Sequence, residues 1–530
     1  MKKYFRHILG ALCVAFLSVS CSTDLLDIPQ QGVDGTDLYV TGDDTQLNQF
    51  LAAVYAKLHG DYTASSVSFG GDGSTSYLLF GTTLSSMADE ETNAFNYSEG
   101  ADGSTYRAIW SYFYTLAYWC GMIVENVPAN EVATPAVRDR VVAEARAIRA
   151  YAMMYLVQLY GNPPLADHII ASDDANTPAE QSWTFIEREL SEAADVLPSK
   201  SGLGGQSSIG GRLTKEACYA LLGKAQLWQG KYAESAQTLY NKVISTGKYA
   251  LVDDPDLLNL SDSDFSDENI WEFDFNNDPQ YQDSQEGSFD VFAVAWQPTM
   301  NGVNYPMFFM HYGIGSNPTS EFYNFMKSHD GESSPRFNAW VANAEQVQSE
   351  AISFTFPITG NQGYFKKKLQ PRAKDIVGSN FMLKYSLKNL VFMRYAEVLL
   401  NFAEASCQAG TLTSEGLAAL NLVRSRAGLA AAPSLEMNDS SYGIKAERRA
   451  ELYGENGNRF IDLVRWGDAA SVLADVGKNS YTLQGIEGGK YNVTSSATGG
   501  TGFKAGKNEL FPIPDTDRNN NPSLEQNPGW

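Results

Sequence analysis

Cysteine and histidine are scarce in this chain, with five of each among 530 residues. Beyond Cys21 the cysteines are Cys120, Cys218 and Cys407, an odd number, and each falls within a helical apolar pattern. This arrangement favours buried free thiols over a disulfide framework or a zinc site. The histidines also lack the spacing of metal ligands. The sequence therefore predicts neither a metal nor a cofactor.

Basic residues are also few, 39 against 62 acidic ones, and the formal net charge is −23. No stripe of Lys and Arg offsets this charge, so nucleic acid should be repelled. A hydrophobic content of 43% excludes a disordered chain. The length exceeds what one core usually supports, and we expect two lobes or an elongated repeat.

Long hydrophobic runs are rare as well. The run from Ile8 to about Val19 is too short to cross a bilayer as a helix, and it follows Lys2, Lys3 and Arg6. Residues 1–20 are therefore interpreted as a secretory signal. Ser18-Val19-Ser20-Cys21 is similar to a bacterial lipobox, although Leu is more usual at the first position. We expect lipid on Cys21 and a tether over 21–43; the alternative is an ordinary cleavage site that happens to precede a cysteine.

Apolar residues at helical spacing are the most frequent pattern in the chain. Apolar residues recur every three or four positions over 43–58, 105–127, 136–160 and 182–197. Trp110 lies on such a face and is expected in the core, whereas Arg138, Arg146 and Arg149 are expected to point outward.

Two further segments, 220–244 and 403–423, carry small residues where tetratricopeptide repeats do, Gly223 and Ala405 among them. We predict a mainly α fold, a degenerate tetratricopeptide-like scaffold at about 44–60, 104–250 and 381–470.

A large loop-rich insertion with short strands is expected to interrupt this scaffold. Residues 269–275 alternate like a strand, and 321–326 resemble a helix. The loop-rich lobe is predicted at about 61–103, 251–380 and 471–508, before a closing tail at 509–530. With the scaffold it forms one domain over 44–530.

Charged residues crowd the stretch 446–467. Glu447, Arg448 and Arg449 lie on a short helix expected to end near Gly454. A second helix follows, with Asp462 at i, i+3 from both Arg459 and Arg465. This cluster could be catalytic, but no nucleophile or metal-ligand set accompanies it, so a salt-bridged brace between helices is favoured.

The same stretch carries a family resemblance. ERRAEL followed by NRFIDLVRWG resembles the signature of the RagB/SusD family of outer-membrane nutrient-binding lipoproteins, and segments 143–165, 392–405 and 510–530 resemble other family segments in the right order. The resemblance implies a lipid-anchored protein on the outer face of the outer membrane. It also implies a TonB-dependent (SusC-like) barrel as the partner, over which the protein sits as a lid.

No motif predicts an enzyme. Asp89-Glu90-Glu91 could supply a glycosidase acid, but three acids in a loop are usually a solvated face. Asp515-x-Asp517-x-Asn519 opens like a calcium loop, yet it lacks the glycine and the bidentate glutamate that such a loop needs. We predict no catalytic residue and no metal ligand.

A binding surface remains as the expected function. Flat aromatics beside fixed amides and carboxylates suit neutral saccharides, and two loop regions, 62–97 and 276–312, have that composition. The alternative is that these aromatics, Tyr97 included, fill a second core. The candidate ligand residues are Trp296, Tyr305, Tyr77, Tyr281, Asn301 and Asn93.

The leading hypothesis is capture of oligosaccharides and their delivery to the transporter. Three others stay open: the same architecture binding peptides, a helical-repeat scaffold that holds other proteins, and a hydrolase.

Overall fold

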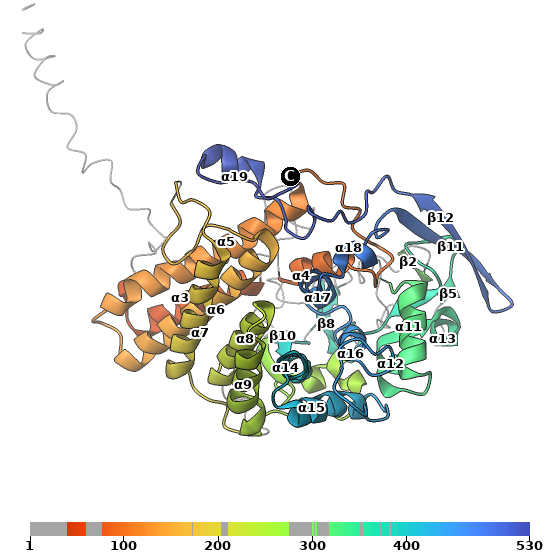
Figure 1. Ribbon diagram of the computed structural model, residues 1–530, viewed down its shortest axis with the longest axis horizontal. Helices are drawn as coiled ribbons and strands as arrows, with labels where there is room; N and C mark the ends of the chain where they lie inside the picture. The colour runs from red at the N-terminus through yellow and green to blue at the C-terminus, as the bar shows by residue number, and fades with distance from the viewer. Residues whose placement is uncertain are drawn as a thin grey trace, which may run out of the picture.

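The computed structural model describes residues 40–59, 77–171, 173–202, 210–274, 299–300, 303–304, 317–349, 353–370, 373–380, 383–386 and 388–530. Helices dominate these residues, as expected (Figure 1). The first long ones are α3 (Asp44–His59), α5 (Ser104–Asn126), α6 (Pro135–Tyr160) and α7 (Ala179–Val196). α6 begins at Pro135, whose fixed φ suits a first helical position. It ends before Gly161, whose φ of +73° favours glycine.

The two predicted repeat-like units are helix pairs. The first is α8 (Lys215–Trp228) with α9 (Tyr232–Lys242), and the second is α14 (Tyr395–Ala409) with α15 (Thr413–Arg426). Although far apart in the sequence, they pack directly, α9 against α14. A Cβ on Gly223 would lie 2.3 Å from Leu239 Cδ2, so the small residue does permit the close packing of α8 and α9. The tetratricopeptide-like scaffold is confirmed.

One hydrophobic core runs through this scaffold. It takes apolar residues from every long helix and from β1 (Asn269–Phe273), which pairs antiparallel with β10 (Leu390–Arg394). Trp110 is buried in it, and so are Cys120 and Cys218; Cys407 is half-buried, and all three are free thiols. Arg149 was expected to point outward, and this is wrong: it is buried, and its Nη2 lies 2.6 Å from Glu189 Oε2 on α7. α7 covers the face of α6 that carries Arg149.

Smaller elements form the other side of the molecule, at the right of Figure 1. They surround two small cores, one around Trp340 and Tyr453 and one around Phe365 and Leu483. The helices are α11 (Ser320–Asp330), α12 (Pro335–Trp340) and α13 (Ala344–Ser349). There too β4 (Val341–Asn343) pairs antiparallel with β7 (Tyr364–Lys366), and β3 (Val303–Asn304) joins β2 (Thr299–Met300) to β5 (Ser353–Phe354). Outside this group, β8 (Ile376–Asn380) pairs antiparallel with β9 (Leu383–Ser386).

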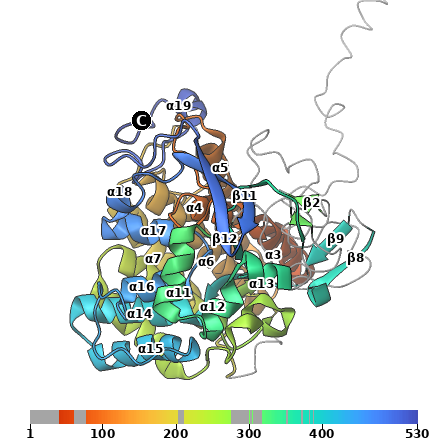
Figure 2. The same ribbon diagram turned by 90° about the vertical axis from the view of Figure 1, so that its right-hand side faces the viewer.

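A β-hairpin occupies the segment 471–508, for which only a loop-rich character was expected. Its strands β11 (Asn479–Glu487) and β12 (Lys490–Ala497) meet at Gly488-Gly489, and β11 also pairs with β6 (Ile358–Thr359). Figure 2 shows the hairpin as a long arm beside α13. Two glycines between runs of β-branched and aromatic residues are a hairpin signal that the glycine- and threonine-rich composition obscured.

The remaining short elements connect these parts. They are α4 (Tyr77–Ser86), α16 (Ile444–Glu451), α17 (Asn458–Trp466), α18 (Ala469–Val472) and α19 (Asp515–Asn520), and the 3₁₀ turns η2 (Val127–Ala129), η4 (Ile244–Thr246), η5 (Pro255–Asn259), η6 (Ser261–Ser263) and η7 (Ala373–Asp375). None of the helices in the described part of the chain is both long enough and apolar enough to span a membrane.

Candidate functional site

The charged helices α16 and α17 form a buried ion network. Arg448 Nε lies 2.8 Å from Asp462 Oδ2, and Arg465 also pairs with Asp462. Glu447 accepts from Arg336 of α12 and from Arg424 of α15. All of these side chains are buried, so the predicted brace between helices is confirmed. Its carboxylates are already engaged by guanidinium groups.

Glu451 lies at the centre of this network. Burial alone would raise the pKa of its carboxyl group, but the guanidinium groups of Arg426, Arg394 and Arg336 together lower it well below its usual range. Glu451 is therefore a fixed negative charge that holds α16 against α12, β10 and α15.

Glu90 and Glu91 are buried in the same region and the Asp89 side chain is only 7% exposed, so the expected place of these acids on a solvated face is wrong. Asp89 accepts from Arg459 Nε at 2.8 Å and from Arg449 Nη2 at 2.7 Å. Glu91 pairs with Lys366 of β7 at 3.1 Å. Arg459, expected to face Asp462, thus reaches a partner 370 positions earlier in the chain. The family-like stretch 446–467 fixes the position of residues 89–91.

Glu90 differs from its two neighbours. Its nearest cation is Arg449, with Nε 3.9 Å from Oε1, and that oxygen has no hydrogen-bond partner. Burial, aided by the charges of Asp89 and Glu91, raises the pKa of Glu90 to about 8 despite the nearby Arg459 and Arg449. Glu90 is therefore mostly protonated at neutral pH.

The two loop regions expected to bind ligand are joined where they end. The Thr92 backbone N–H donates to the Asn317 carbonyl, and the Thr319 N–H donates to the Glu90 carbonyl, both at 2.8 Å. Glu91 and Pro318 form an antiparallel bridge between these segments. Residues 90–92 near the end of the first region thus pair with residues 317–319, which follow the second.

The described residues that precede the two regions also lie side by side. His59, the last residue of α3, stacks on Phe273, the last residue of β1, with ring centroids 5.0 Å apart and 24° between the ring planes. Region 62–97 begins just after His59, and region 276–312 begins just after Phe273. Described residues that border the two regions therefore lie together on both sides.

The structure describes few of the predicted ligand residues. Trp296, Tyr305, Tyr281 and Asn301 lie outside the described residues, and of Tyr77 only its place as the first residue of α4 is described. Asn93 is exposed, directly after Thr92.

Tyr97 belongs to the core instead. It is 4% exposed, and its hydroxyl donates to the Met87 carbonyl. Tyr97 is therefore a core residue and not a ligand contact, but it lies in the main core of the scaffold, whereas the alternative expected a second core. Sequence reasoning missed three residues that position the acids at 89–91: Arg449, Arg459 and Lys366. No local pattern around these three residues indicates Asp89 or Glu91 as a partner.

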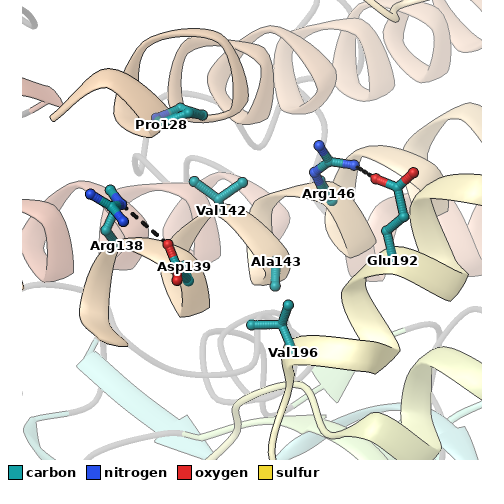
Figure 3. A pocket seen from close by; sticks show the side chains of 8 residues that line it. All are labelled: Pro128, Arg138, Asp139, Val142, Ala143, Arg146, Glu192 and Val196. Carbon is teal, nitrogen blue, oxygen red and sulfur yellow. Dashed lines mark hydrogen bonds and ion pairs between the residues drawn. The ribbon is translucent and has the colours of Figure 1, made fainter. Parts of the chain in front are cut away.

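A separate pocket of about 350 Å³ lies on the helical scaffold (Figure 3). Its apolar lining comes from Pro128, Val142, Ala143 and Val196. Two ion pairs border it, Arg138 with Asp139 and Arg146 with Glu192. These residues belong to η2, α6 and α7, so the pocket is not formed by the loop regions. Within the described ranges no three His, Cys, Asp or Glu side chains are grouped to hold a metal ion.

A sequence model of the SusD family matches residues 261–530. The chain belongs to the SusD family. It is 23% identical over 506 residues to SusD-like protein P2 of Formosa agariphila, covering 90% of this chain and 92% of that relative. A SusD-like protein of Bacteroides ovatus is 23% identical over 481 residues, which cover 85% and 81% of the two chains.

Solved structures give the same fold. A laminarin-binding SusD-like protein is 26% identical, with a TM-score of 0.69 over 92% of this chain and 99% of its own. Surface glycan-binding protein A from Bacteroides thetaiotaomicron is 21% identical, with a TM-score of 0.69 over 93% and 100%. The family expected from the four sequence segments is thus confirmed.

Proposed function

We propose that this SusD-family protein is a cell-surface outer-membrane lipoprotein that binds oligosaccharides and hands them to a TonB-dependent transporter. Lipid on Cys21 anchors it, and the transporter is its partner. Family membership supports this, and so do the names of its structural relatives, one of which binds laminarin while another was solved with laminarihexaose.

The observation that carries the proposal is that described residues bordering the two loop regions lie together on both sides. The composition of the two regions brings aromatic rings together with amide and carboxylate groups, and these suit the apolar faces and the hydroxyls of sugars. We assign ligand contact to Trp296, Tyr305, Tyr77, Tyr281, Asn301 and Asn93.

The proposed role is capture and release without chemistry. Asp89 and Glu91, which could have acted as catalytic carboxylates, are held by Arg449, Arg459 and Lys366. Each stacked ring contributes only about 0.5–1.5 kcal/mol beyond area burial, so affinity should be modest and release easy. Incubation with any bound glycan should produce no new reducing ends.

Calorimetric titration tests the ligand class. The protein is titrated with laminarin oligosaccharides, with other neutral glycans and with a pool of peptides. Saturable binding of one glycan class, without binding of the peptides, is expected. Saturable peptide binding without any glycan signal would contradict the proposal and favour a peptide-binding lipoprotein.

The partner is tested on membranes. After extraction in mild detergent, the protein should co-purify with a TonB-dependent barrel that mass spectrometry identifies. Purification without any barrel protein would contradict the delivery step but leave glycan binding intact.

A further inference from the structure

The pocket between α6 and α7 has the form of a docking site for a short aliphatic segment. Val142 and Val196 offer an apolar surface, and Val196 is 50% exposed. Arg138 and Arg146 stand at the rim, and eight residues of helix separate them by about 12 Å (Figure 3). The pocket thus combines an apolar floor with two guanidinium groups, each of which is paired with a carboxylate of the lining, Asp139 or Glu192.

The first described residue of the chain lies close to this rim. Val40, the first described residue, is buried, and its carbonyl accepts from Asn130 Nδ2 at 2.8 Å. The Asn130 carbonyl in turn accepts from Arg138 Nη1 at 3.2 Å. Asn130 is also two positions after Pro128, which lines the pocket. Asn130 therefore links the first described residue of the chain to the pocket.

The sequence before Val40 has the matching chemistry. Residues 25–29, Leu-Leu-Asp-Ile-Pro, place three aliphatic side chains around one acid. Residues 21–39 contain four aspartates and no Lys or Arg. Pro29 precedes Val40 by eleven positions, a stretch that can extend to about 36 Å. The segment is long enough to return to the pocket, and Asp27 can pair with Arg138 or Arg146 in exchange for Asp139 or Glu192.

We propose that residues 25–29 dock in this pocket. Leu25, Leu26 and Ile28 cover Val142 and Val196, and Asp27 faces the arginines. The pairs of Arg138 with Asp139 and of Arg146 with Glu192 involve side chains that are a quarter or more exposed, so exchanging these partners costs little. Arg146 also keeps its second partner, the buried Glu189. Burial of the aliphatic side chains drives the docking.

Docking shortens the free part of the tether. Only residues 22–24 would then lie between Cys21 and the docked segment, so Cys21 and Leu25 would be at most about 14 Å apart. If Cys21 is lipidated as proposed above, the α6–α7 side of the scaffold is held near the membrane. The docking itself does not depend on the lipid.

Disulfide trapping tests the contact in the full chain. Leu26→Cys is combined with Val196→Cys, and in a control with Leu422→Cys, whose native side chain is similarly exposed (51%) on α15. Under mild oxidation the 26–196 disulfide should form at least tenfold faster than the 26–422 disulfide. Mass spectrometry of the linked peptides distinguishes these disulfides from those of other thiols. Equal rates would overturn the proposal.

Hydrogen exchange gives a second measurement without new cysteines. The backbone amides of residues 25, 26, 27 and 28 should exchange at least tenfold more slowly than in a free peptide. The protection should vanish in the triple variant Leu25→Ser, Leu26→Ser, Ile28→Ser while the melting temperature changes little. Exchange at the free-peptide rate in the unaltered protein would overturn the proposal. Protection that rises with protein concentration would overturn it in favour of a second copy.

Discussion

At the residue scale, two tryptophans separate ligand contact from core packing. Trp110 is 4% exposed and packs between Tyr114 and Tyr160, with ring centroids 4.6 and 4.9 Å away. Trp110→Ala should cost about 3–5 kcal/mol of stability, because burial is lost and a cavity remains. If Trp296 is a ligand platform, Trp296→Ala should weaken glycan binding about tenfold or more with an almost unchanged melting temperature.

Calorimetric titration and thermal melting of both variants check this pair. A destabilised Trp296→Ala variant that binds glycan normally would remove the leading candidate. The site would then be assigned to Tyr77 and Tyr305.

Glu90 makes the stability of the protein depend on pH. Its folded-state pKa of about 8 exceeds the usual carboxyl value of 4.5, so the folded state keeps a proton that the unfolded state loses. Stability is therefore lost as pH rises from about 4.5 to 8, by up to about 1.4 kcal/mol per pH unit from this group. Glu90→Gln should remove this slope and leave the variant more stable than the unaltered protein at pH 8.

Urea unfolding of both proteins at several pH values measures the difference in slope. Glu91→Gln is the matched control: it breaks the pair with Lys366 and should destabilise the protein across this range. Parallel stability curves for the unaltered protein and Glu90→Gln would show that Glu90 is ionised in the folded state.

At the scale of elements, Asp89 joins α16 and α17 to the paired loop segments. Asp89→Ala leaves Arg459 and Arg449 without their closest carboxylate in a largely buried place, which should cost about 3–5 kcal/mol. Asp475→Ala is the control, because Asp475 pairs with Lys478 but is 89% exposed, and its change should stay within about 0.5 kcal/mol.

The same variant tests whether the brace supports the binding surface. Glycan affinity per folded molecule should fall in Asp89→Ala, because residues 90–92 hold residues 317–319. Unchanged affinity in a destabilised variant would limit Asp89 to a role in stability.

Helix packing in the scaffold depends on Gly223. In α8 a methyl group there would clash with Leu239 of α9, so Gly223→Ala should destabilise by about 1–3 kcal/mol although alanine favours helix. Gly121→Ala in α5 is the matched control, since its nearest neighbour, Ile169 Cγ1, is 3.6 Å away. That change should be neutral or stabilising by up to about 1 kcal/mol; thermal unfolding compares them.

At the scale of the whole molecule, attachment to the membrane is expected to depend on Cys21. The described helices include none able to span a bilayer. Cys21→Ala should leave the folded body with an unchanged melting temperature but release it from the membrane fraction after centrifugation. A variant that still sediments with membranes would indicate another anchor or tight binding to the transporter.

Much of the architecture was predictable because it rests on local pattern. Apolar residues at helical spacing determine where helices form, and they placed Trp110 in the core before any tertiary contact was known. The four family segments and the three free cysteines are likewise features of the sequence itself. Composition indicated which loops suit a sugar, without placing any single side chain in a site.

Tertiary structure decided which buried charges pair with each other and which single aromatic residues are buried. Arg459 could pair with a near acid or a distant one, and only packing placed Asp89 beside it. Arg149 lies inside because α7 covers it, and Tyr97 lies inside although it sits in a polar loop. A helical or loop pattern determines which residue types lie together in the sequence. Which of them meet in space depends on how elements hundreds of residues apart fill one core.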